Sequence, residues 1–156
     1  IMATAAIPGF KASLHVSATS DSGGTTGMGV RFAELRDFTL TIAAGALDAT
    51  SKDSAGWKEH LPGLKEWSGS GSANYLQETS GVGQTSAYAA LIAGSNLGVV
   101  LYQGSSLGTI AGTSQQKWTG TAVVTGWDVE SPLDGAAVLK ISLKGTGAIT
   151  KAAATS

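Results

Sequence analysis

A serine in a glycine-rich run is the first candidate for catalytic chemistry in this sequence. Residues 104–108, Gly-Ser-Ser-Leu-Gly, match the pattern Gly-x-Ser-x-Gly, in which a sharp turn between a strand and a helix exposes a nucleophile, here Ser106. That chemistry needs a histidine later in the chain to take the proton of the serine. Both histidines, His15 and His60, come earlier, and 22 glycines make a chance match easy. We therefore interpret this run as a flexible turn and expect no enzyme.

A histidine and several carboxylates lie close together in residues 48–60, where a metal or acid–base site is conceivable. Asp48, Asp53 and Glu59 lack the alternating order of oxygen ligands of a calcium loop, and His60 fits no ligand spacing. The chain has no cysteine, and no glycine-rich phosphate-binding motif followed by lysine. We predict no metal and no cofactor, and interpret His60 as a solvated or interface side chain.

The four tryptophans, Trp57, Trp67, Trp118 and Trp127, allow a third kind of site, a platform on which sugar rings stack. The alternative is that they fill the core or a subunit interface, where large rings contribute most to burial. Trp57 differs from the others because it follows Gly56 in a polar stretch. Its apolar ring needs a partner or a fold-back onto the body of the protein.

The composition narrows the function classes further. The net charge is −1 and the pI about 6.1, so there is no basic footprint for gripping DNA phosphates tightly. Charged residues are 13% of the chain, against roughly 25% in ordinary soluble domains. A weakly charged surface promotes association, and suggests that copies of the chain cover one another. No run of about 20 apolar residues occurs, so no membrane span is expected.

The elements that must position these residues are mostly strands. Alternating polar and apolar residues predict strands at 10–18, 36–44, 64–76, 97–103, 117–129 and 136–149. Residues 84–94 predict a short helix, with Tyr88, Leu91 and Ile92 as its apolar stripe and Gly94 as its end. No alternation of strand and helix occurs, which favours a single mainly β domain over residues 1–156. The expected fold is an antiparallel β-sandwich or partly closed barrel with one short flanking helix.

The segments between these elements carry their own expectations. Residues 19–29 are rich in Ser, Gly and Thr and predict a flexible loop or arm, and residues 131–135 predict the turn of a long hairpin. Residues 151–156 have no core-forming pattern and predict a loose C-terminal tail. The longest irregular segment, about Leu47 to Pro62, is a polar loop of the size that is usually functional.

The residue order of this loop and several shorter motifs resemble the major tail protein family of long-tailed bacteriophages. The matching residues in and after the loop are Asp48, Thr50, Lys52-Asp53-Ser54, Gly56-Trp57-Lys58-Glu59, Leu61-Pro62-Gly63-Leu64 and Trp67-Ser68. Further matches are Gly9-Phe10-Lys11, residues 32–40, Thr125-Gly126-Trp127 and Leu143-Lys144-Gly145-Thr146-Gly147. The loop motif is fairly specific, and the resemblance runs through most of the chain.

The resemblance implies a structural subunit of a tail tube. It implies a β-sandwich with a flanking helix, of which six copies close into a ring through continuous sheet, and rings that stack into a hollow tube. The loop reaches the adjacent ring in such proteins. The ring-stacking residues expected here are Asp48, Thr50, Lys52, Asp53, Trp57, Lys58 and Glu59.

The resemblance also implies partners and a location. Besides copies of itself, these are the tape measure protein and tail-end proteins, in the tail of a virion assembled in the bacterial host cytoplasm. DNA is expected to pass through without tight binding, and because a basic lining would hold its phosphates, a neutral or acidic channel is expected. The alternative interpretation is another virion or surface β-domain, such as a decoration or carbohydrate-binding module.

Overall fold

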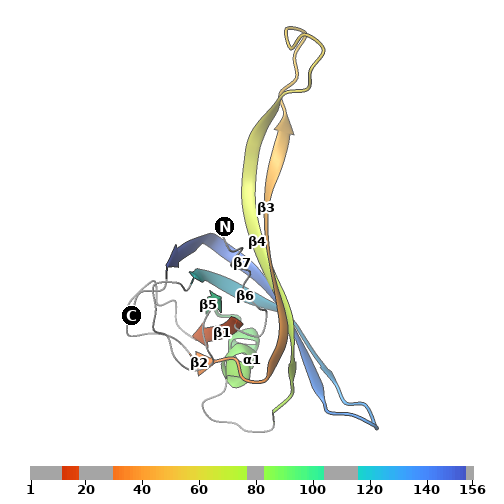
Figure 1. The fold of residues 1–156 in the computed structure, drawn as a ribbon, viewed down its shortest axis with the longest axis vertical. Coiled ribbons are helices and arrows are strands. Elements are labelled where there is room, and N and C mark those ends of the chain that lie inside the picture. The colour runs from red at the N-terminus through yellow and green to blue at the C-terminus, as the bar shows by residue number, and fades with distance from the viewer. Residues whose placement is uncertain (1–11, 18–29, 77–82, 104–115, 154–156) are drawn as a thin grey trace, which may run out of the picture.

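The computed structural model describes residues 12–17, 30–76, 83–103 and 116–153, which form one seven-stranded antiparallel sheet and one helix (Figure 1). The sheet order is β2-β1-β5-β6-β7-β4-β3, and the sheet is not closed into a barrel. The elements are β1 (Ala12–Ser17), β2 (Val30–Arg31), β3 (Leu35–Asp48), β4 (His60–Asn74), α1 (Gly83–Ala93), β5 (Leu97–Gln103), β6 (Gln116–Glu130) and β7 (Val138–Ala153). The predicted mainly β, antiparallel fold with one short helix is confirmed.

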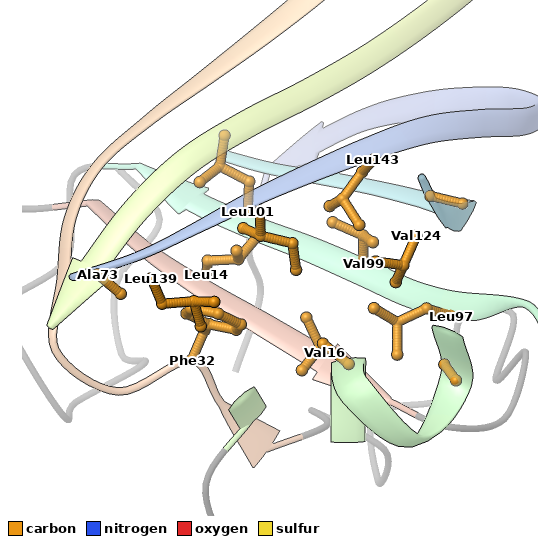
Figure 2. Packing of buried hydrophobic residues seen from close by; sticks show 14 of the residues in the cluster. Leu14, Val16, Phe32, Ala73, Leu97, Val99, Leu101, Val124, Leu139 and Leu143 are labelled. Atoms are coloured by element: carbon orange, nitrogen blue, oxygen red, sulfur yellow. The ribbon is translucent and has the colours of Figure 1, made fainter. Parts of the chain in front are cut away.

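The core lies on the concave side of this twisted sheet, where β4 and β7 pass across β1 and β5 (Figure 2). Alternate residues of each strand point into it, as the pleat of a strand requires. Fully buried side chains include Leu14 of β1, Leu97 of β5 and three residues of β7, Leu139, Ile141 and Leu143. The alternation predicted for the last strand therefore correctly identifies its buried face.

The helix packs differently from the sequence prediction. Tyr88 and Ile92 are exposed and Leu91 is only partly buried, so the predicted apolar stripe is wrong. The buried residues are small or polar: Gly83, Gln84, Ala87 and Ala90. Small residues let the helix backbone approach the sheet closely. A Cβ atom added at Gly83 would lie 2.8 Å from Cγ2 of Val16.

A buried glutamine ties the start of the helix to two other segments. Nε2 of Gln84 donates hydrogen bonds to the carbonyl oxygens of Ala33 (3.2 Å) and Asn74 (2.8 Å). Its Oε1 accepts a hydrogen bond from the backbone N–H of Leu76 at 3.2 Å. The amide is buried with both of its ends hydrogen-bonded, so it fixes the helix against the end of β4 and the start of β3.

The predicted loose tail is also wrong in part, because β7 runs on to Ala153. Its last residues pair with the beginning of β6, and Nζ of Lys151 lies 5.1 Å from the centre of the Trp118 ring. Hydrogen bonds to a neighbouring strand make these residues a strand, although their sequence shows no alternation of polar and apolar residues. The two-residue strand β2, which pairs with His15 and Val16, is missed by the sequence for the same reason.

Some sequence predictions lie outside the described residues. These are the glycine-rich run at 104–108, the whole loop predicted at 19–29, both ends of the first predicted strand and the final residues 154–156. Within the described part of the chain, no helix is long and apolar enough to cross a membrane.

Candidate functional site

The most prominent feature of the molecule is a two-stranded arm, residues 41–66, that extends β3 and β4 far beyond the body (Figure 1). Nearly every residue of the arm is exposed, although opposite faces of a strand normally differ in burial. Large apolar side chains are among those exposed: Ile42, Leu47, Trp57, Leu61 and Leu64, the last at 93%. Isolated two-stranded hairpins are marginally stable in water. This arm therefore presents apolar surface that one copy of the chain leaves uncovered.

The strands of the arm reach further than predicted. Leu47 and Asp48 belong to β3 and pair with Leu61 and His60 of β4, so the predicted loop at Leu47 to Pro62 is strand at both ends. The irregular segment, which we call the tip, is residues 49–59. The extension follows from cross-strand pairing, since residues directly opposite each other support the ladder regardless of burial.

The tip is an ordered, hydrogen-bonded turn. The backbone N–H of Ser51 donates to Oγ of Ser54 at 3.0 Å, and Ser54 is the one buried residue of the tip, 7% exposed. The backbone N–H of Trp57 donates to the carbonyl oxygen of Ser54 at 2.9 Å, which closes a turn around Ala55 and Gly56. Both central residues have positive φ, 49° and 85°, as in a type I′ turn. Together these bonds hold the tip in one shape.

This shape presents Trp57, which is 80% exposed. The possibility that its ring folds back onto the body is thereby excluded for the single chain. The bond from Trp57 N–H to Ser54 fixes the backbone from which the ring projects, and the positive φ of Ala55 marks strain that the turn sustains. A large, fixed, exposed aromatic side chain is a typical anchor of a protein interface.

The other predicted stacking residues lie in the same tip, except Asp48, which directly precedes it at the end of β3. Asp48 and Thr50 stabilise it, since Oδ1 of Asp48 accepts a hydrogen bond from the Thr50 backbone N–H at 2.9 Å, and Oγ1 of Thr50 accepts one from the Glu59 N–H at 3.1 Å. The bond to Thr50 holds the pKa of Asp48 below its usual range. Four charged residues, Lys52, Asp53, Lys58 and Glu59, are exposed around Trp57. Their role in stacking stays a prediction.

At its base, the arm is locked to the body by Trp67. Its ring fills a space between β6 and β7 that exists because Gly120 and Gly145 have no side chains. A Cβ atom would lie 2.6 Å from the ring at the first glycine and 2.2 Å at the second. Nε1 of Trp67 donates to the carbonyl oxygen of Gly147 at 3.2 Å, and Gly147 has the positive φ that favours glycine. The Gly145-Thr146-Gly147 motif is therefore a socket for this ring.

The side of the sheet opposite the core is polar across β3, β4, β7 and β6. Register places Thr41, Ser68 and Lys144 in one row, and Thr39, Ser70 and Ser142 in the next. Two lysines on this polar face are paired: Nζ of Lys144 lies 2.8 Å from Glu66 and Nζ of Lys140 lies 2.5 Å from Glu130. The bond from Lys144 holds the pKa of Glu66 below its usual range. The polar face thus carries lysines whose charge is already matched.

The ends of the sheet complete the candidate assembly surfaces. β3 lies at one end of the strand order, and residues 38–47 of this edge carry no charge. The four long strands lie in the order β3-β4-β7-β6, so β6 is on the side away from β3. It pairs with β5 only up to Ala122, and from Val123 to Glu130 it pairs with β7 alone, which leaves its other edge open there. A long, uncharged edge strand is a template for pairing with another chain.

The described residues contain no cluster of metal-binding side chains. His60 lies opposite Asp48 on the exposed arm, and no group of three His, Asp or Glu side chains that could hold a metal occurs in the described segments. Of the four tryptophans, Trp67 is buried, Trp118 and Trp127 are partly buried against the core, and Trp57 is exposed. They do not form a common platform.

The sequence analysis missed the apolar arm residues and the glycine socket. Phe38, Leu40 and Ile42 alternate with threonines and indicate a half-buried strand, but the pattern does not show that the body ends near residue 41. One signal for the glycine socket was present in the sequence: a large ring, Trp67, and a Gly-x-Gly motif near the C-terminus that could leave room for it. Pairing them requires knowing that β4 and β7 are neighbours.

Comparisons with known proteins agree on one family. The family model described as phage tail tube protein matches residues 14–151. The fold resembles a chain from the virion of a native gene transfer agent particle, at 17% identity and a TM-score of 0.72, covering 95% of this chain and 100% of that one. It also resembles the SPP1 tail tube, at 15% identity and a TM-score of 0.69, covering 97% and 81%. No curated protein matches the chain.

A third similar structure comes from the sheath/tube terminator of an extracellular contractile injection system, at 13% identity and a TM-score of 0.65, covering 95% of this chain and 97% of that one. At these identities the structures establish the fold, and the family match, which spans most of the chain, establishes the relationship. The resemblance inferred from the sequence is confirmed, and the chain belongs to the phage tail tube protein family as a structural subunit of a tail tube.

Proposed function

We propose that this chain assembles into rings of six copies that stack into a hollow tube, through two distinct contacts. Edge pairing between sheets closes each ring, and the arm joins one ring to the next. The observation that carries the proposal is the arm itself, with apolar side chains exposed on strands that have no body beneath them. A related structure, the tail of an empty gene transfer agent particle, has C6 symmetry and supports the number six.

The ring contact follows from the two free strand edges. In a ring, the uncharged edge of β3 in one copy can pair with the Val123–Glu130 edge of β6 in the next, so that every copy uses both edges. Closure removes the exposed edges that would make a monomer prone to aggregate. Such pairing makes one continuous sheet around the ring.

The contact between rings is assigned to the tip and the residue just before it, through Asp48, Thr50, Lys52, Asp53, Trp57, Lys58 and Glu59. Contacts between the front of one ring and the back of the next do not close, and therefore build a filament. Trp57 supplies the buried anchor, and the charged residues form a rim whose exposed ion pairs contribute little.

The polar face is proposed to line the channel. Its serines and threonines are neutral, and Lys140 and Lys144 are paired with glutamates, so it offers DNA phosphates few free cations. Because phosphate binding proceeds through counterion release at basic side chains, this lining lets DNA pass without being held. Preformed tubes should show no salt-dependent retention of double-stranded DNA, and submicromolar retention would contradict the proposed lining.

The remaining partners follow from the family. We propose that the tube forms around a tape measure protein, ends at tail-end proteins, and is assembled in the host cytoplasm before it joins the virion. No catalytic step is part of this role. Ser106→Ala and His60→Ala should leave assembly nearly intact, and a hydrolase activity lost in either variant would contradict the structural role.

Electron microscopy of the purified protein tests the main proposal. We expect six-fold rings or tubes, with the mass per unit length that six copies per ring dictate. A closed dimer or dispersed monomers as the only species would overturn it, and would favour the alternative of a decoration or carbohydrate-binding module.

A further inference from the structure

A pocket opens at the end of the body from which β3 departs. It has a volume of about 700 Å³, within the range of about 300–1,000 Å³ typical of binding pockets. Its buried lining residues, Leu14, Phe32 and Leu101, belong to the core cluster of Figure 2. Leu35 and Phe38 of β3 form its wall and are only partly buried. The pocket is therefore lined by apolar and polar groups together, and the side chains of the described residues do not fill it.

The rim of this pocket carries charges of both signs. Arg31 and Arg36 are exposed, and Glu34 lies between them in the sequence, with its carboxylate 3.4 Å from Nδ2 of Asn74. The tip of the arm likewise carries charges of both signs around one apolar ring. A pocket with apolar side chains inside and charges of both signs at its rim matches the chemistry of an exposed indole ring surrounded by charges of both signs.

One chain cannot bring the two together. The pocket is at the start of β3 and the tip follows its end, and the 14 residues of this strand span roughly 45 Å at about 3.3 Å per residue. The tip and the pocket therefore meet only between different copies. Because they occupy opposite ends of one strand, the contact is head-to-tail and repeats without closing.

We propose that this pocket receives the arm tip of a second copy of the chain, with the indole of Trp57 as the inserted group. Insertion covers the 80%-exposed ring and completes the burial of Leu35 and Phe38 at once. Arg31 and Arg36 face Asp53 and Glu59 of the incoming tip, and Glu34 faces its lysines. The inference rests on the proposed stacking function and names the surface that the tip contacts.

Disulfide trapping tests the contact directly, because the chain has no cysteine of its own. The full-length double variant Lys58→Cys with Arg31→Cys places one thiol beside Trp57 and one on the rim of the pocket. Oxidised tubes should yield a ladder of disulfide-linked chains longer than dimers, because each copy has one tip and one pocket. Each single variant should give no such ladder.

A matched control pairs the same rim residue with a different exposed hairpin turn. Arg31→Cys with Asp134→Cys keeps one thiol in the pocket and moves the other to the β6–β7 turn, where residues 131–137 are exposed apart from Ala137, which is partly buried. No ladder is expected. Adding Trp57→Ala to the Lys58→Cys and Arg31→Cys pair should slow ladder formation about tenfold or more, as loss of an interface anchor does, whereas Trp57→Phe should preserve it.

The outcomes separate the inference from the function on which it rests. Tubes that form normally but link no better than the control pair overturn the pocket assignment and leave the tail tube function standing. If the unsubstituted protein forms no tubes, both fall. A link within one chain between Ala6→Cys and Arg31→Cys would show that the N-terminal segment of the same copy fills the pocket, and would overturn the inference.

Discussion

β4 passes from the arm into the body without interruption, and its two halves meet different surroundings. From Trp67 to Ala73, alternate positions are buried against the core, and Ala73 is fully enclosed. From Leu61 to Glu66 nearly every residue is exposed, and Leu64 is almost fully so. The backbone conformation is the same in both halves. Strand formation in β4 depends on hydrogen bonds to the neighbouring strands. The burial of its side chains depends on whether the core packs against that part of the sheet.

This contrast separates two kinds of stability. The body supplies the free energy of unfolding of one chain, through a buried core cluster with side chains from β1, β4, α1, β5, β6 and β7. The arm contributes apolar surface whose burial awaits another copy. Substitutions in the body should therefore change the unfolding of the monomer, and substitutions in the arm should change assembly.

Trp67 lies at the boundary, and Trp67→Ala should have the largest effect. Removing its ring empties the glycine socket, and Trp→Ala changes in a core typically cost about 3–5 kcal/mol. The expected result is a much lower denaturation midpoint in urea or heat. Gly145→Ala should also destabilise, because its methyl group would overlap the ring. An unchanged midpoint in both variants would show that the arm base is not locked as described.

Trp57→Ala should separate assembly from folding most clearly. The exposed ring contributes nothing to the body, so thermal stability of the monomer should not change. Loss of an interface anchor costs on the order of 2 kcal/mol per contact, and six contacts per ring multiply the effect. We expect folded subunits that do not assemble into long tubes. Electron microscopy measures this as the number and length of tubes.

The comparison variant is Trp127→Ala. Trp127 is partly buried against the core and its ring lies 5.5 Å from that of Tyr88, so its removal should lower thermal stability directly. Full-length tubes of the Trp57→Ala protein, with unchanged stability, would refute the stacking role of the tip tryptophan.

Ser54→Ala should have a smaller effect on the arm alone. It removes the hydroxyl oxygen that accepts a hydrogen bond from the Ser51 N–H inside the tip. The loss should destabilise the folded turn by about 1 kcal/mol. The protein concentration at which tubes first appear should rise roughly fivefold, the factor that this energy produces. Sedimentation of tubes over a concentration series measures it. Ser70→Ala, on the exposed polar face, is the matched control, and an equal shift there would contradict the assignment.

The smallest effect should be a pH dependence at the base of the arm. The hydrogen bond and the charge of Lys144 lower the pKa of Glu66 in the folded state. Its contribution to stability is therefore complete above its ordinary pKa of 4.5 and is lost as the pH falls through the lowered folded value. Lys144→Met should abolish this part of the acid sensitivity in thermal melts. A steeper acid loss in the variant would reverse the sign assigned here.

Much of the fold could be predicted from the sequence because its strands alternate. The six longer strands and the helix all correspond to predicted segments, and the buried residues of β7 were identified by their spacing. The predictions failed where a neighbour decides the outcome. Residues 151–153 became strand because β6 lies beside them, and the buried face of α1 consists of Gly83, Gln84 and two alanines because the helix comes close to the sheet.

The candidate site divides in the same way. Asp48 and the tip that follows it could be located because polar side chains and glycine broke the strand pattern. Their hydrogen-bonded order could not, since it depends on Ser54 being enclosed by its own turn. The pocket was also invisible, because Leu14, Phe32 and Phe38 are brought together by packing across strands that are distant in sequence.

The length of the arm has a consequence for the dimensions of the tube. Under the stacking contact proposed above, the separation of successive rings is set by how far β3 and β4 extend past the body. Each added pair of residues per strand lengthens the arm by about 7 Å while keeping every side chain on its original face. The axial repeat would then change without any new contact surface. The number of residues in β3 and β4 beyond the body would therefore determine the distance between successive rings.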